Sequence, residues 1–255
     1  MPGGLFKMSK EPNIQPLVPV PDIKGLDNTA EELLKPYVGN AGQETGLGSQ
    51  IQGMIYVPEV NLHFTETRQF LNKNYPDTQA LIPQTRISGR KIFIPMPRQF
   101  RAFLKFLRNS RDASHQALFK DITEKRDPYR ANRVNARFEQ RGNAMWMISE
   151  HVLENGDYTT KEQMLQDYLA HDKKPGISLD SWIDSTTSHG LPPANISSGE
   201  LWYWQPVSGR VAGFYAGSEG SLLNCGRVPQ YSFSGLGVFV CAEGAAKKII
   251  KKFLN

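Results

Sequence analysis

The stretch of sequence that decides the fold is RVAGFYAGSEGSLLNCGRVPQYSFSGLGVFVC, from Arg210 to Cys241. Side chains suited to packing alternate there with side chains that share no chemical character. The packing set is Phe214, Ala216, Ser218, Leu223, Cys225, Arg227 and Pro229, and it interleaves with Tyr215, Gly217, Glu219, Leu222, Asn224, Gly226 and Val228. In an extended segment successive side chains face opposite ways, so we expect a frame on one face and a surface of variable chemistry on the other.

The composition is typical of a globular protein. The 255 residues are 39% hydrophobic, enough to bury a sizeable core in one large domain or two small ones. Charged residues make up 22%, a share that argues against wholesale disorder. The net charge of +5 permits contact with phosphate or acidic surfaces but does not require it.

The composition changes at about residue 50. Four prolines in 11–21 favour an extended segment, and a glycine-rich segment follows. We expect residues 1–50 to form an arm that packs on the body or on a neighbouring subunit, and residues 51–255 to form the folded domain. The N-terminus lacks the apolar run of a secretory signal, and no stretch is long enough to cross a bilayer. We therefore expect a soluble chain, whose location the sequence leaves open.

Helix and strand signals recur along residues 54–201. Pro97 precedes an apolar stripe at helical spacing, Asn155-Gly156 signals a turn, and Thr160 with Gln163 matches a capping box. We expect strands at 54–57, 91–94, 145–153 and 236–241, and helices at 65–74, 98–109, 160–172 and from Ser178 or Asp180 to Gly190. Beyond residue 201 we expect only short strands and long loops.

Motifs for nucleotide, metal or nucleophilic chemistry are mostly absent from the sequence. Residues 216–220, AGSEG, approach a nucleophile elbow, but that motif needs a helix directly after the serine, and Gly226 and Pro229 prevent one. The five histidines are too dispersed for a helical metal pair. The only two cysteines, Cys225 and Cys241, exclude a disulfide framework and a four-thiolate metal site. We expect two buried free thiols, with a single bridge left open.

Two further patterns each allow two interpretations. Arg98, Arg101, Lys105 and Arg108 lie on one helical face, which is either a phosphate-binding surface or simply a solvated face. The segment Leu201–Trp204 holds three adjacent aromatic residues, which cannot all share one buried face. One or two of them should be partly exposed, as in binding sites, unless the segment is a core strand at a sheet crossing.

The segment from Gly209 to Val238 resembles the variable region of proteins that diversity-generating retroelements diversify in archaea, viruses and bacteria. In that family a template rich in asparagine codons is copied with errors at adenines, which leaves a fixed skeleton. The matching skeleton residues here are Arg210, Val211, Ala212, Phe214, Ala216, Ser218, Leu223, Cys225, Arg227, Pro229, Ser232, Ser234, Leu236, Gly237 and Val238. Upstream, residues 121–130 and His189-Gly190-Leu191-Pro192 resemble two other family segments, so the resemblance extends from about Met54 to Cys241.

The resemblance implies an α+β fold of the C-type-lectin-like class, in its formylglycine-generating-enzyme-like subclass. Short antiparallel strands, two principal helices and long loops would form a rigid platform with the chain ends brought together, and no calcium or other cofactor is needed. The variable region would span about residues 210–239. The ligand-binding residues would be Tyr215, Gly217, Glu219, Leu222, Asn224, Gly226, Val228, Tyr231 and Phe233.

Two positions depart from that scheme. Changes at the adenines of an asparagine codon cannot give glutamate, so Glu219 comes from another template codon or is fixed. Gly213 stands where the family often has arginine, which a change at an adenine in an arginine codon would explain.

The function that the resemblance implies is non-catalytic binding of a variable macromolecule, a protein or glycoconjugate on another cell or host surface. Display would need a virion or a partner, and the oligomeric state stays open. Two alternatives remain. One is a copper oxidase related to sulfatase-activating enzymes, which share this general fold and would use Cys225 and Cys241. The other is a nucleic-acid-binding module that uses the basic row from Arg98 to Arg108 and the C-terminal lysines.

Overall fold

The computed structural model describes residues 51–185 and 187–244, all of which belong to one unit of the chain, Gln43–Asn255. These residues are mixed α and β, mostly sheet with few helices, which is compatible with the α+β class. The expected arm of residues 1–50 and the C-terminal lysines lie outside the described residues. None of the helices within the described ranges has the length and apolar character needed to span a bilayer.

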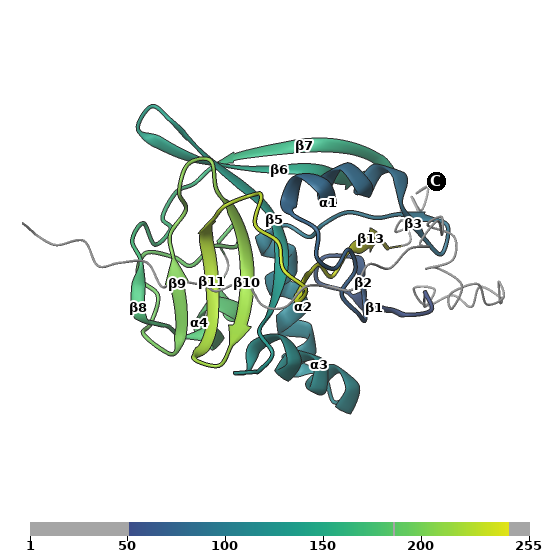
Figure 1. Ribbon diagram of the computed structural model, residues 1–255, viewed down its shortest axis with the longest axis horizontal. Helices are drawn as coiled ribbons and strands as arrows, with labels where there is room; N and C mark the ends of the chain where they lie inside the picture. The colour runs from purple at the N-terminus through teal and green to yellow at the C-terminus, as the bar shows by residue number, and fades with distance from the viewer. Residues whose placement is uncertain (1–50, 186, 245–255) are drawn as a thin grey trace, which may run out of the picture. The chain divides into compact units, whose positions relative to one another are not determined.

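The main sheet has 8 strands in the order β7-β6-β5-β10-β11-β9-β8, with β12 beside β5 (Figure 1). Its strands are β5 (Arg130–Arg141), β6 (Ala144–Glu154), β7 (Asp157–Met164), β8 (Lys173–Ile177), β9 (Leu201–Trp204), β10 (Val211–Gly217), β11 (Gly220–Arg227) and β12 (Leu236–Gly237). The expectation of short antiparallel strands holds only in part. β5 and β6 have 12 and 11 residues, and β9 and β12 pair in parallel with β11 and β5.

Two smaller sheets complete the β structure of the described residues. One joins β1 (Met54–Val57), β2 (Leu62–Thr65) and β13 (Cys241–Glu243), and the other joins β3 (Arg86–Ile87) to β4 (Arg90–Lys91). The strand expected at 54–57 is confirmed. That expected at 91–94 is wrong beyond Lys91, where β4 ends, and Phe93 pairs only through an isolated bridge to Cys241. The closing strand expected at 236–241 is buried throughout but is divided between β12 and β13.

The helices are α1 (Tyr75–Leu81), α2 (Pro97–Asn109), α3 (Ala113–Thr123) and α4 (Leu179–Asp184), with a 3₁₀ turn at Ile82–Gln84. α2 confirms the helix expected at 98–109: it begins at Pro97 and buries the apolar stripe. α4 is capped by the Ser178 hydroxyl, as expected, but ends well before Gly190. Gly190 has a φ of +80° and its Cβ would lie 2.2 Å from the Arg98 nitrogen, so this glycine allows the chain to approach α2 closely.

The helix expected at 65–74 is wrong. Thr65 ends strand β2, and Phe70 and Asn72 have positive φ angles, which interrupt a helix. The segment is bonded instead to the end of the domain, since Gln69 and Val238 exchange two backbone hydrogen bonds. Pro76 stands in the first turn of α1 rather than after a helix end.

The helix expected at 160–172 is also wrong, because residues 157–164 form β7. Asn155 and Gly156 both have positive φ angles, as in the two-residue turns that join antiparallel strands. β7 therefore returns along β6 (Figure 1). The strand expected at 145–153 and its turn are confirmed by β6.

The core lies on the inner face of the main sheet, against α2 and α4. Phe214 of β10 is fully buried, with its ring 5.8 Å from Trp182 of α4 and 6.0 Å from Phe100 of α2. Leu223 and Cys225 of β11 belong to the same apolar cluster. The packing of these inner-face side chains fixes the backbone of β10 and β11.

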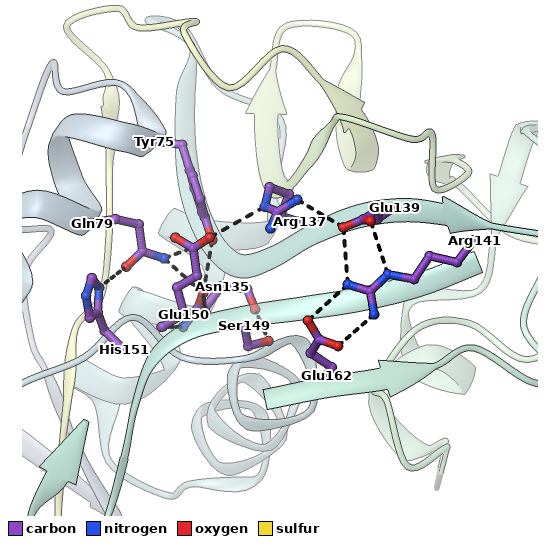
Figure 2. A network of polar contacts seen from close by, with 10 residues as sticks. All are labelled: Tyr75, Gln79, Asn135, Arg137, Glu139, Arg141, Ser149, Glu150, His151 and Glu162. Atoms are coloured by element: carbon purple, nitrogen blue, oxygen red, sulfur yellow. Dashed lines mark hydrogen bonds and ion pairs between the residues drawn. The ribbon is translucent and has the colours of Figure 1, made fainter. Parts of the chain in front are cut away.

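A buried polar network joins α1 to β5 (Figure 2). Asn135 of β5 is fully buried; its Oδ1 accepts hydrogen bonds from the Tyr75 hydroxyl at 3.1 Å and from the Gln79 amide at 3.0 Å. Its amide donates to the carbonyl oxygens of Ile94 and Glu150. The network fixes the position of α1, whose first residue contacts the loop after β11.

Candidate functional site

The register of β10 and β11 confirms that their successive side chains face opposite ways. Tyr215 is paired with Leu222 and Gly213 with Asn224, whereas Phe214 is paired with Leu223. Residues paired in an antiparallel ladder share a face. The first two pairs therefore lie on the outer face, opposite the core.

The outer face carries an apolar cluster of its own. Ala131 of β5, Tyr215 and Leu236 form its buried part, and Tyr129, Leu222, Tyr231 and Phe233 pack against them. The Tyr129 ring lies 4.9 Å from Phe233 and 5.9 Å from Tyr215, both stacked. Four of the nine expected ligand-binding residues thus come together around Tyr129, which was not among the nine.

Arg227 also lies on the outer face, although its place in the alternation predicted a frame residue. The ladder is irregular between Val211 and Gly213, and such a bulge changes which side chains share a face. The Arg227 guanidinium lies 4.0 Å from the Tyr231 ring centroid and 5.0 Å from that of Tyr215. The expectation that Arg227 belongs to the packing set is therefore corrected.

The loop after β11 is held through its backbone. The Pro229 carbonyl accepts from the Tyr75 N–H at 2.9 Å, and the Gly235 carbonyl accepts from the Ala131 N–H at 3.0 Å. The Tyr231 carbonyl accepts from the buried Arg133 guanidinium at 2.8 Å. None of these bonds involves a side chain of the loop itself.

Polar contacts fix the segment 121–130, which contains Tyr129. Asp121, at the end of α3, accepts hydrogen bonds from Arg68 and Arg130 and also contacts Arg126. These cations keep the pKa of Asp121 below its usual value, against the desolvation that raises it. The Arg126 N–H donates to the Gly217 carbonyl at 3.1 Å. The segment therefore anchors the end of β10 as well as Tyr129.

The aromatic run of β9 is divided between the two faces. Trp202 and Trp204 are in register with Leu222 and Asn224, on the outer face, and Tyr203 is in register with Leu223 and fully buried. Trp202 is half-buried under Lys174, whose Nζ lies 4.0 Å from its ring centroid, and Trp204 is 39% exposed. The expectation that one or two of these aromatic residues are partly exposed is confirmed.

The nine expected ligand-binding residues differ in exposure. Glu219 and Val228 are exposed, and Gly217, Leu222, Gly226, Tyr231 and Phe233 are half-buried. Tyr215 and Asn224 are only 3% and 1% exposed, so the expectation that all nine are surface residues is wrong for these two. A Cβ on Gly213 would lie 2.8 Å from the Tyr215 ring, so this glycine provides the space in which the ring is buried. Asn224 is held by a 2.8 Å bond from the Gly226 N–H to its Oδ1.

Comparisons of the chain with family models, curated proteins and solved structures find no match.

The basic row on α2 is not a free surface. Arg101 is buried and donates to the Ile183 carbonyl at 2.6 Å, whereas Arg108 forms ion pairs with Asp180 and Asp184 at 2.8 Å. Lys105 lies 3.8 Å from Asp184. Arg101 also forms an ion pair with Glu59. Of the four residues of this row, Arg98 alone is exposed and has no ion pair among the described residues.

Cys225 and Cys241 are buried free thiols, as expected. Burial raises the pKa of both thiols, which disfavours the thiolates that copper would bind. No group of three or more histidine, cysteine, aspartate or glutamate residues within the described ranges has a metal-binding arrangement. A hollow of about 730 Å³ lies elsewhere, beside Arg98, Glu154 and Glu243, and none of the nine residues lines it.

The free energy of unfolding at high pH should depend on the ionisation of Tyr129 and Tyr215 on the outer face. Burial raises the pKa of Tyr129 to about 12 and also raises that of Tyr215. Their unfolded pKa is about 10, so the folded state binds more protons above that pH, and the free energy of unfolding should fall between about pH 10 and 12.

Urea denaturation at several pH values measures the effect. Tyr129→Phe removes one of the contributing hydroxyls, so its free energy of unfolding should fall less steeply with pH than that of the unaltered chain. Equal slopes for the two proteins would show that Tyr129 ionises as readily in the folded state as in the unfolded one.

Proposed function

We propose that this chain is a non-catalytic binding protein of the type that diversity-generating retroelements diversify. Its ligand would be a macromolecule on another cell or host surface. The binding surface is the outer face of β10 and β11 with the loop that follows. Its replaceable side chains are Gly217, Glu219, Leu222, Gly226, Val228, Tyr231 and Phe233, with Tyr215 and Asn224 as more constrained members.

The observation that carries this proposal is the backbone anchoring of the loop. Hydrogen bonds from Tyr75, Ala131 and Arg133 end on carbonyl oxygens of the loop, which every residue type possesses. The inner-face side chains fix the adjoining strands independently. Replacing exposed side chains usually changes stability by less than about 0.5 kcal/mol. A rigid platform also lowers the entropy lost on binding, which favours useful affinity from arbitrary side chains.

Three features support a C-type-lectin-like fold. Antiparallel pairing of β13 with β2 brings the start and end of the described domain together. α2 and α3, of 13 and 11 residues, are the two longest helices of the described ranges. The segments 121–130 and 189–192, which resemble family elements, contact β10 and α2 respectively, where they brace the frame.

Sequencing the gene and its surroundings in a population tests the proposal. Copies should differ at codons of the outer-face residues, while codons for Phe214, Leu223 and Cys225 stay constant. A reverse transcriptase and a near-identical template repeat should lie nearby. Differences spread evenly over the gene, with neither element present, would contradict the proposal.

A binding selection tests the same surface directly. We expect a library of the full chain randomised at Glu219, Leu222, Gly226, Val228 and Tyr231 to yield binders with different sequences for unrelated protein targets. The matched control randomises Ala212, Phe214, Leu223 and Cys225, and it should yield few folded proteins. Binders from the control library but none from the first would locate binding elsewhere.

A further inference from the structure

Arg227 lies among the aromatic residues of the outer face with part of its guanidinium unused. Its Nε and Nη2 donate to the hydroxyls of Tyr215 and Tyr129, both at 3.4 Å, while the Tyr231 ring lies against its plane. Nη1 has no hydrogen-bond acceptor among the described residues. The three tyrosines hold the Arg227 guanidinium in place, and its Nη1 remains as a donor for a partner.

Three cations of the outer face form no ion pair with a carboxylate of the described residues. They are Arg227, Arg133 and Lys174. Several arginines elsewhere are paired, as Arg68 is with Asp121 and Arg141 with Glu162. Arg227 therefore keeps an unpaired positive charge that is complementary to an anionic group of a partner.

An apolar patch adjoins Arg227. Trp204, Val207 and Val228 are 39%, 42% and 42% exposed, and they are among the few large apolar residues that the described chain exposes. A Cβ on Gly226 would be 3.5 Å from a Val207 methyl group, so Val207 lies beside the residue that precedes Arg227. Trp204 is in register with Asn224 of β11, the strand that contains Gly226. Trp204 and Val207 lie outside the variable set, so part of this surface is constant.

We propose that Arg227 is a constant anchor that binds a carboxylate of the target, and that the target is an acidic protein surface with an apolar neighbour for Trp204, Val207 and Val228. This inference rests on the proposed function and names the class of partner. A planar guanidinium suits a carboxylate, and aromatic and arginine side chains are the usual anchors of protein interfaces. A nucleic acid would need several spaced cations, whereas the row on α2 is largely buried or paired.

Selection from a phage-displayed library of random linear peptides on the immobilised full chain tests this proposal. Peptides enriched on the unaltered protein should contain aspartate or glutamate next to apolar residues. Arg227→Met keeps the stacked stem and should weaken binding of those peptides by about tenfold or more, because a charge-assisted hydrogen bond is lost. The matched control is Arg111→Met, an exposed cation between α2 and α3, which should change binding by less than about twofold.

Two further variants and a DNA-binding assay complete the design. Arg227→Lys keeps the charge without the planar fork, so an intermediate loss is expected; it replaces Arg227→Met if that variant does not melt cooperatively. The variant Val228→Ser tests whether the selected peptides bind at this surface at all. Peptides that lose binding in Val228→Ser, but contain no acidic residue and still bind Arg227→Met, would overturn this inference and leave the proposed function intact. Peptides that depend on neither Val228 nor Arg227, or the recovery of none, would contradict both. Salt-sensitive retention of DNA that Arg227→Met abolishes would overturn the protein partner.

Discussion

Phe214→Ala should lower the free energy of unfolding by about 3–5 kcal/mol, the usual cost of removing a buried phenylalanine ring. Phe214 is fully buried between Trp182 and Phe100, so the cavity would open beneath β10. The two helices that contribute these rings are fixed by other contacts and cannot close it fully. Urea denaturation measures the loss as a lower midpoint at an unchanged slope.

The control for this variant is Val228→Ala on the other face. Val228 is 42% exposed, so the change should be less than about 0.5 kcal/mol. A loss below about 1 kcal/mol for Phe214→Ala, or similar losses for both variants, would show that the domain does not separate a packed inner face from a replaceable binding surface.

Asn135→Ala should lower the free energy of unfolding by about 3 kcal/mol, because several buried polar groups lose their partners together. Tyr75, Gln79 and the Glu150 N–H all donate to Asn135 Oδ1. Burial raises the pKa of Tyr75, so its hydroxyl stays protonated at neutral pH and would be left as a buried donor without this acceptor. Loss of the network should also loosen the Tyr75–Pro229 hydrogen bond and raise amide exchange in the loop after β11.

Two comparisons separate hydrogen bonding from packing at Asn135. Asn135→Leu restores volume but leaves the same donors unpaired, so it should be about as destabilising as Asn135→Ala. Gln140→Ala, at the exposed end of the same strand, should cost less than about 0.5 kcal/mol. Full recovery of stability in Asn135→Leu would show that the network contributes only by filling space.

Local signals predicted some elements well and others wrongly. Pro97 and the apolar stripe were sufficient for α2, because capping and burial agree there. At 160–172 a capping box and helix-forming residues indicated a helix, but the turn at Asn155-Gly156 pairs this segment with β6. Long-range pairing then overrides local propensity. α3 and β5 were not predicted, and the bonding of residues 66–74 to the end of the domain leaves no trace in their own sequence.

The candidate site was predictable in outline but not in its detail. Alternation along residues 210–228 gave the two faces, since side-chain direction in strands is a local property. The involvement of Tyr129 depends on β5 pairing with β10, and that of Arg227 depends on a bulge. The burial of Tyr215 depends on the absence of a side chain at Gly213. These three are tertiary effects that the alternation cannot reveal.

The central claim is that the frame holds its shape whatever side chains stand on the outer face. The most direct measurement is the free energy of unfolding of one variant that carries Glu219→Ser, Leu222→Asn, Val228→Ser and Tyr231→Asn together. We predict a cooperative transition and a loss of about 2 kcal/mol or less, because Glu219 and Val228 are exposed and Leu222 and Tyr231 are only half-buried. Failure to fold, or a loss as large as that of Phe214→Ala, would show that these residues hold the domain together and would contradict the account.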